Sequence, residues 1–199
     1  QQEANLVLQW IEGYTVNYPI VFDIEDKCHK NLSNQQLIDI INAFCTTIDA
    51  AGYYPMVYSY KNMFDTKLSI CGWDRWVAQY NSSCGHTNNV CFWQYSSSGK
   101  VNGFSGRVDV NYQFKDYSNL IISDGFIEHN GNVRFYRNWK MQKGWVDFND
   151  TRYYLDGAGN LIRGWYTEGE KTYYLTTEDG SIARGQRNVD GADFYFTAE

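Results

Sequence analysis

The sequence predicts two domains: part of an α/β TIM-like barrel at residues 1–118 and an all-β solenoid of hairpin repeats at 124–199, joined by a linker at 119–123. Three observations support this prediction. Strand and helix patterns alternate in the first part. Aromatic motifs recur about every 20 residues in the second part. All 5 cysteines and both prolines precede residue 120, whereas 10 of the 17 glycines follow residue 123.

The first part contains the elements of a partial barrel. Apolar residues at helical spacing predict one helix over Gln1–Ile11 and another that begins at Ser33 and ends at Gly52. Apolar runs predict strands at Tyr18–Glu25, Met56–Tyr60, Trp76–Tyr80, Val90–Tyr95 and Arg107–Asn111. Strands that alternate with helices indicate a parallel sheet, and five strands are too few to close an eight-stranded barrel. We therefore expect the missing strand–helix units to precede residue 1.

The second part repeats a hairpin. Gly144-Trp145 recurs as Gly164-Trp165, and Tyr153-Tyr154-Leu155 recurs as Tyr173-Tyr174-Leu175 and, less closely, as Phe194-Tyr195-Phe196. Glycine-containing turns separate the copies, which is the pattern of stacked β-hairpins. The aromatic side chains either fill the core of the stack or form open cages for sugars or quaternary amines.

Composition excludes two classes of partner. The formal net charge is −6 and the chain has no basic run, so nucleic-acid binding is not expected. No apolar run approaches the ~18 residues of a membrane helix, so we expect no membrane-spanning segment.

Carboxylates give the strongest chemical signal. Asp23 and Glu25 are two residues apart at the end of an apolar strand, so their side chains share one face. Two adjacent carboxylates beside apolar residues do not both ionise readily, and the pKa of one of them rises. A carboxylic acid that keeps its proton near neutral pH can protonate the leaving oxygen in glycoside hydrolysis. Asp109, between Val108 and Val110 of a later strand, is a third candidate. The alternative interpretation of Asp23 and Glu25 is that they lie in a solvated loop at the start of a helix and have no catalytic role.

Five ordered motifs resemble glycoside hydrolase family 25, the muramidases or lysozymes with a partial-looking barrel. These motifs are Tyr18–Asp26, Ala51–Tyr58, Trp76–Tyr80, Trp93–Ser97 and Gly103–Asn111. The resemblance spans roughly residues 1–115. It implies cleavage of the β-1,4 bond between N-acetylmuramic acid and N-acetylglucosamine in peptidoglycan. It also implies a further catalytic-site Asp on a first strand that this sequence lacks.

The resemblance also implies roles for individual residues. Glu25 corresponds to the general acid/base, and Asp23 to the residue that stabilises the transition state or orients the acetamido group of the substrate. Asp109 corresponds to a residue at the edge of the site. The resemblance places Tyr58, Tyr80, Trp93 and Gln94 along the sugar cleft.

The repeats resemble choline-binding-type cell-wall-binding repeats. That family builds its choline cage partly from a Trp just before the paired aromatics, where this sequence has Arg134, Arg152, Thr172 and Asp193. Each choline cage would therefore lack one wall. The resemblance implies attachment to the cell wall, through choline or another wall ligand, and does not assign choline as the ligand. The residues to which this expectation extends are Trp145, Tyr153, Tyr154, Trp165 and Tyr173.

The cysteines allow more than one interpretation. Cys84 and Cys91 flank a turn-rich loop that a disulfide would close in a secreted protein. The Cys and His spacings match no standard zinc motif, so no metal or other cofactor is expected. Cys45 lies on the apolar face of its helix, where a free buried thiol is the simplest interpretation.

Two functions remain open at this stage. One is a secreted muramidase, either a bacterial autolysin or a phage endolysin, which acts at the cell wall and is tethered there by its repeats. The other is a non-catalytic wall- or glycan-binding fragment that lacks the first barrel strands.

Overall fold

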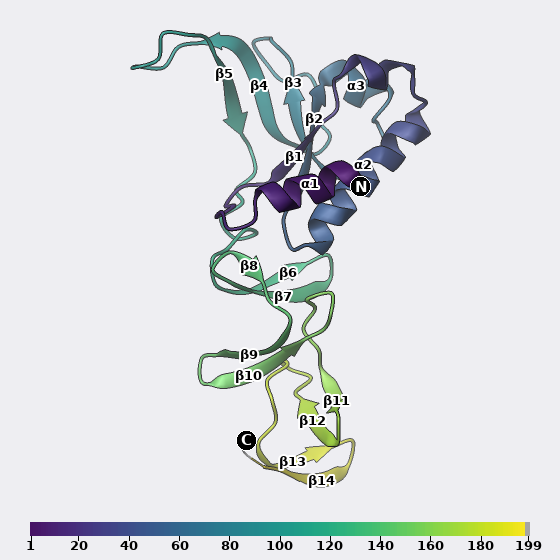
Figure 1. Ribbon diagram of the computed structural model, residues 1–199, viewed down its shortest axis with the longest axis vertical. Coiled ribbons are helices and arrows are strands. Elements are labelled where there is room, and N and C mark those ends of the chain that lie inside the picture. Colours follow the sequence, from purple (N-terminus) through teal and green to yellow (C-terminus); the bar gives the residue numbers. More distant parts are fainter. Residues whose placement is uncertain (198–199) are drawn as a thin grey trace. The chain divides into compact units, whose positions relative to one another are not determined.

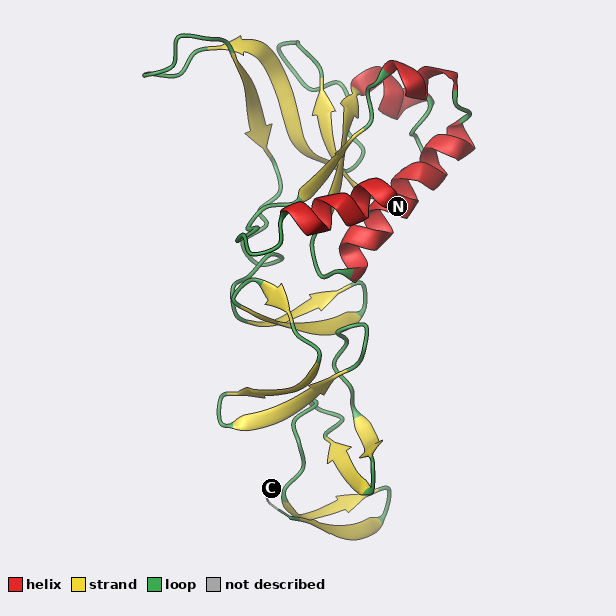
Figure 2. Cartoon of the chain, viewed as in Figure 1, coloured by secondary structure: helices red, strands yellow, loops and turns green. Residues whose placement is uncertain are grey.

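The computed structural model describes residues 1–197 of the chain, which forms two compact units, Gln1–Ile121 and a second from Ile122 onward (Figure 1). The first is a mixed α/β unit and the second consists of β-hairpins (Figure 2). None of the helices in the described residues has the length and apolar character required to cross a membrane.

A five-stranded sheet forms the centre of the first unit, with the strands in sequence order. Strands β1 to β4 pair in parallel, whereas β5 is antiparallel to β4. The prediction of an entirely parallel sheet is therefore wrong at its last strand, because the short segment 100–107 can close a hairpin but cannot hold a crossover helix. The strands are β1 (Ile20–Asp23), β2 (Pro55–Tyr60), β3 (Asp74–Ala78), β4 (Val90–Gly99) and β5 (Val108–Gln113).

The two predicted helices are confirmed, and the structure contains two further short helices that were not predicted. Helix α2 begins after Ser33, whose side chain accepts a hydrogen bond from Gln36 N, while the Gln36 side chain accepts one from Ser33 N. This capping box satisfies two backbone N–H groups that the first turn leaves unpaired. Two elements were not predicted because a single turn carries too few residues to show a period. The helices are α1 (Gln2–Trp10), the 3₁₀ helix η1 (Lys27–Asn31), α2 (Asn34–Ala50) and α3 (Lys61–Thr66).

The core of the first unit lies between α2 and one face of the sheet. Phe22 of β1 stacks on Phe44 of α2, with ring centroids 4.5 Å apart. Ile24, just after β1, is fully buried in the same cluster. Because side chains alternate along a strand, burying Phe22 and Ile24 directs Asp23 and Glu25 to the opposite face.

The second unit is a series of antiparallel hairpins. Several hairpin turns contain two residues with positive φ, such as Asn149 at 50° and Asp150 at 61°. Such turns match the right-handed twist of the paired strands. The strands are β6 (Gly125–His129), β7 (Asn132–Arg137), β8 (Lys140–Met141), β9 (Gly144–Phe148), β10 (Thr151–Leu155), β11 (Gly164–Glu168), β12 (Lys171–Leu175), β13 (Gly185–Val189) and β14 (Ala192–Phe196).

Apolar residues from neighbouring hairpins bury one another. Tyr153 lies in a cluster with Phe135 and Leu155, and its ring centroid is 4.7 Å from that of Phe126. Tyr153 is therefore a core residue, and the prediction that it contacts the wall is corrected. Adjacent Tyr154 points to the other face of β10, so only one residue of this aromatic pair faces outward.

We predict that Ile41→Ala lowers the free energy of unfolding by about 2–5 kcal/mol, because it removes a fully buried side chain from the core. The matched control is Ile40→Ala on the same helix, where the side chain is 37% exposed and the change stays within about 1 kcal/mol. Urea unfolding followed by far-UV circular dichroism measures both. Equal losses in the two variants would contradict this assignment of the core.

Candidate active site

Asp23 and Glu25 meet at one cavity of the first unit. The cavity has a volume of ≈ 550 Å³ and lies at the carboxyl end of β1. The loop after β1 is held by Asp26, whose carboxylate accepts a hydrogen bond from Cys28 N at 3.1 Å and so caps η1. The lining residues are Glu3, Asp23, Glu25, Asp26, Lys27, Cys28 and His29.

The two carboxylates interact electrostatically. Partial burial raises the pKa of Asp23, and the adjacent charge of Glu25 raises it further, while His29 acts in the opposite direction. The sequence predicts that one member of the pair has a raised pKa. The raised pKa is that of Asp23, whereas the resemblance assigns the acid role to Glu25. Asp23 therefore keeps its proton to a higher pH than an isolated aspartate does.

Glu25 has a free oxygen and one aromatic neighbour. Within the described residues its Oε2 atom is buried and makes no hydrogen bond. The charge of Glu25 raises the pKa of the Tyr60 hydroxyl, so the two side chains lie near each other. Sequence reasoning missed Tyr60, the last residue of β2. Its position could have been inferred, because Tyr60 follows Tyr58 by two residues, just as Glu25 follows Asp23 by two at the end of the neighbouring strand.

Tyrosines and a glutamine extend the polar face beside the carboxylates. Tyr58 is the neighbour of Asp23 in the register of β1 and β2. Tyr58 and Tyr80 both donate hydrogen bonds to Gln94 Oε1, each at 3.0 Å. Three of the four residues predicted to line the cleft are therefore brought together.

Trp76 also belongs to this face, and sequence reasoning did not select it. Its ring packs edge-on against Tyr58 with centroids 5.4 Å apart, and its Nε1 donates to Asn111 Oδ1 at 2.8 Å. Trp76 thus links the polar face of β2 to that of β5.

Trp93 is placed differently from the prediction. It pairs with Val77, a core residue on the other face of the sheet, and its Nε1 donates to Gln79 O at 2.8 Å. Trp93 is buried, and it does not share the face that carries Asp23. The sequence Trp93-Gln94-Tyr95 does not by itself indicate whether Trp93 or Gln94 faces the carboxylates.

Asp109 shares a face of β5 with Asn111 but is exposed. It is not among the residues that line the cavity of Asp23 and Glu25. The structure therefore does not bring the third predicted carboxylate into contact with the other two.

The predicted repeat aromatics lie mainly against one another. Trp145 packs edge-on against Tyr154 and Tyr173, with centroids 5.1 and 4.8 Å apart. Tyr154 stacks on Tyr166 at 3.9 Å, which leaves no space for a ligand between these rings. Trp165 remains 46% exposed beside Tyr174 of its own hairpin.

The cysteines are free thiols in the structure. The disulfide that the sequence left open between Cys84 and Cys91 is not formed. The Cys84 thiol lies near the backbone carbonyl of His86, and the Cys91 thiol lies near that of Asn89. Cys45 is fully buried, and burial raises the pKa of its thiol. In residues 1–197 no group of three or more His, Cys, Asp and Glu residues is arranged to hold a metal ion.

Comparison with known proteins identifies the family of the first part of the chain. The family described as glycosyl hydrolases family 25 matches residues 1–104, so the chain belongs to this family. Its members are peptidoglycan-hydrolysing muramidases.

Individual relatives share parts of the chain. The uncharacterized protein YegX of Escherichia coli K12 is 28% identical over 114 residues, which are 55% of this chain and 41% of YegX. The autolysin LytC of Streptococcus pneumoniae is 30% identical over 55% of this chain and 29% of its own, with a TM-score of 0.49. The Cpl-1 endolysin, crystallised with a peptidoglycan analogue, is 23% identical over 98% of this chain and 60% of its own, with a TM-score of 0.42.

We predict that Asp23→Asn raises the free energy of unfolding at pH 7, by less than about 1 kcal/mol because the site is partly open to solvent. The pKa of Asp23 is higher in the folded chain than its ordinary value of 3.8, so ionisation destabilises the fold as the pH rises through that folded value. The gain should shrink as the pH falls toward 3.8.

Urea unfolding at several pH values measures this gain. The control is Asp109→Asn on the same sheet, an exposed position where the change stays within about 0.5 kcal/mol. A loss of stability in Asp23→Asn at pH 7 would show that the ionised form is favoured by the fold.

Proposed function

We propose that this chain is an N-acetylmuramidase that cuts the β-1,4 bond between N-acetylmuramic acid and N-acetylglucosamine and is held on the cell wall by its hairpin repeats. The observation that carries the proposal is the placement of Asp23 and Glu25 in one cavity at the carboxyl end of a barrel strand. Catalytic groups of α/β barrels lie at this end of the sheet. Membership of family 25 supplies the reaction class.

Glu25 acts as the general acid and base. Its buried Oε2 atom makes no hydrogen bond in the described chain and is available to a substrate oxygen. A proton transferred from Glu25 to the glycosidic oxygen allows the leaving sugar to depart. The Tyr60 hydroxyl, whose pKa the charge of Glu25 raises, lies near this carboxyl group.

Asp23 stabilises the positive charge that develops on the sugar ring or orients the acetamido group of the substrate. Tyr58 and Tyr80 are fixed by their shared acceptor Gln94, so these rings form a preorganised wall for the sugar. Trp93 supports the sheet from its other face, and Asp109, which does not line the cavity, takes no part in this proposal.

The hairpin unit supplies attachment. Trp165 presents an exposed ring, while Trp145, Tyr154 and Tyr173 support the stack from which it projects. Tethering an enzyme to an insoluble substrate raises the local substrate concentration without altering the chemistry. The site of action that follows is the bacterial cell wall, reached by secretion or by release from a phage-infected cell, with peptidoglycan as the partner.

We predict that Glu25→Gln reduces the release of reducing ends from purified peptidoglycan by at least about 100-fold, because a carboxamide is far too weak an acid to protonate the leaving oxygen. Glu128→Gln, on an exposed position of β6, serves as the matched control and retains full activity. Hydrolysis by Glu25→Gln at the parental rate would refute the role of Glu25. Retention on peptidoglycan without new reducing ends in the parent chain would instead establish a non-catalytic binding module.

We also predict that Trp165→Ala lowers the fraction of the chain that sediments with purified cell walls several-fold, because an exposed aromatic contact is lost. Trp10→Ala in the first unit removes a ring that is 67% exposed and should leave sedimentation unchanged. Circular dichroism verifies that both variants fold. Equal sedimentation of the two variants would place wall attachment elsewhere in the chain.

A further inference from the structure

The hairpin formed by β4 and β5 projects beyond the rest of the five-stranded sheet (Figure 1). Strand β4 continues to Gly99, whereas β3 ends at Ala78, the partner of Gln94. Because β1 to β4 are parallel, their carboxyl ends lie at one edge of the sheet. The loop at 100–107 therefore extends from the edge that carries the candidate active site.

The tip of this loop presents an apolar surface. Phe104 N donates to Val101 O at 3.1 Å, which closes a turn, and Gly103 in that turn has a φ of 87°. A Cβ atom at Gly106 would lie 2.6 Å from the Phe104 ring, so this ring rests against the Gly106 backbone. Phe104 is nevertheless 58% exposed and Val101 is 57% exposed. The glycines thus hold an aromatic ring in a fixed position that is open to a ligand.

Both charges of the loop are positive. Gly99 pairs with Val108, so Lys100 and Arg107, the next residue on each side, come together at the base of the loop. Both are exposed, and neither side chain forms a hydrogen bond or an ion pair with any residue that the structure describes. Asp109, the nearest carboxylate along the chain, is also exposed and forms no such pair. Like charges side by side are unfavourable, and an anionic ligand relieves their repulsion.

The place of the loop indicates what carries the anion. The loop is cationic in a chain of net charge −6, and it adjoins the site proposed to hold a wall glycan. Lys100 lies six residues beyond Gln94 along the chain, a distance of at most about 20 Å. An extended peptide of five residues spans about 17 Å. A peptide attached to a sugar beside Gln94 is therefore long enough to meet the lysine side chain.

We propose that the loop at 100–107 binds the acidic peptide stem of the glycan strand, with the stem carboxylates at Lys100 and Arg107 and its alanine methyl groups against Phe104. This inference rests on the proposed function, which supplies peptidoglycan as the substrate. It assigns to the loop a preference for strands whose stem carboxylates are free. An anionic membrane surface would meet the same charges, but it is not attached to the ligand of the adjacent site.

The test is NMR titration of the ¹⁵N-labelled 199-residue chain with N-acetylglucosaminyl-N-acetylmuramyl pentapeptide, either with free carboxylates or with these groups amidated. We expect the acidic compound to bind about fivefold more tightly, with shifts at residues 100–107, because two exposed charge pairs are gained. Added NaCl should reduce this preference, since the charges are exposed. Vesicles of phosphatidylglycerol should leave the loop resonances unchanged.

Variants test the residues. The double variant Lys100→Gln/Arg107→Gln should bind the acidic and amidated compounds equally. The matched control is Lys140→Gln/Lys143→Gln, which removes two exposed positive charges from the second unit and should keep the preference. Phe104→Ala should weaken binding of both compounds. Circular dichroism verifies that each variant folds.

Equal affinity of the parent chain for the two compounds, shifts confined to other residues, or an unchanged preference in the double variant would each overturn the inference. Broadening of the loop resonances by vesicles alone would overturn it in favour of a membrane surface. The titration requires no hydrolysis, so its outcome is separable from that of the proposed function. A chain that releases reducing ends without this preference refutes only the loop assignment, and a chain that shows the preference without hydrolysis refutes only the enzymatic activity.

Discussion

The candidate active site depends on the burial of one residue, Ile24. Its backbone N–H donates to Tyr58 O at 3.0 Å, and its carbonyl accepts a hydrogen bond from Ser59 Oγ at 2.9 Å. With its side chain fully buried, Ile24 has one orientation. Asp23 and Glu25, on either side of it, must then both face the opposite side of the sheet. The same apolar contact that stabilises the fold therefore brings two like charges together.

Placing the two carboxylates on one face affects the pKa of Asp23 and the hydrogen bonding of Glu25. Partial burial and the neighbouring charge of Glu25 raise the pKa of Asp23, and Glu25 keeps one oxygen without a hydrogen bond. Groups held in this way favour a substrate that supplies the missing hydrogen bond or positive charge. The neighbouring strands contribute rigidity, since Tyr58 and Tyr80 share the single acceptor Gln94.

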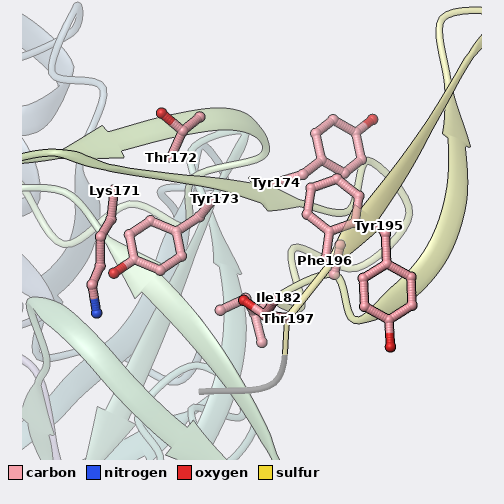
Figure 3. Close-up of a pocket in the computed structure, with 9 residues that line it drawn as sticks. Lys171, Thr172, Tyr173, Tyr174, Ile182, Tyr195, Phe196 and Thr197 are labelled. Atoms are coloured by element: carbon pink, nitrogen blue, oxygen red, sulfur yellow. The ribbon is translucent and has the colours of Figure 1, made fainter.

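In the hairpin unit, large aromatic rings on strands of mostly five residues are buried by packing against one another. Tyr153 enters the core and Tyr154 packs against Tyr166 on the other face, so most rings stabilise the stack. An aromatic repeat is thus mainly a structural device. The packing leaves an open cavity beside β12 and β14 (Figure 3).

The sequence by itself determined the alternation of strands and helices, the change to hairpins near residue 120, and the pairing of Asp23 with Glu25. These features follow from local periodicity, turn residues and spacing, which act over a few residues. Tertiary structure alone decided the antiparallel direction of β5, the inward or outward orientation of Trp93 and Tyr153, the approach of Tyr60 to Glu25, and the separation of the Cys84 and Cys91 thiols. Each of these depends on which distant residue is buried beside it, and a one-residue shift in a strand exchanges its two faces.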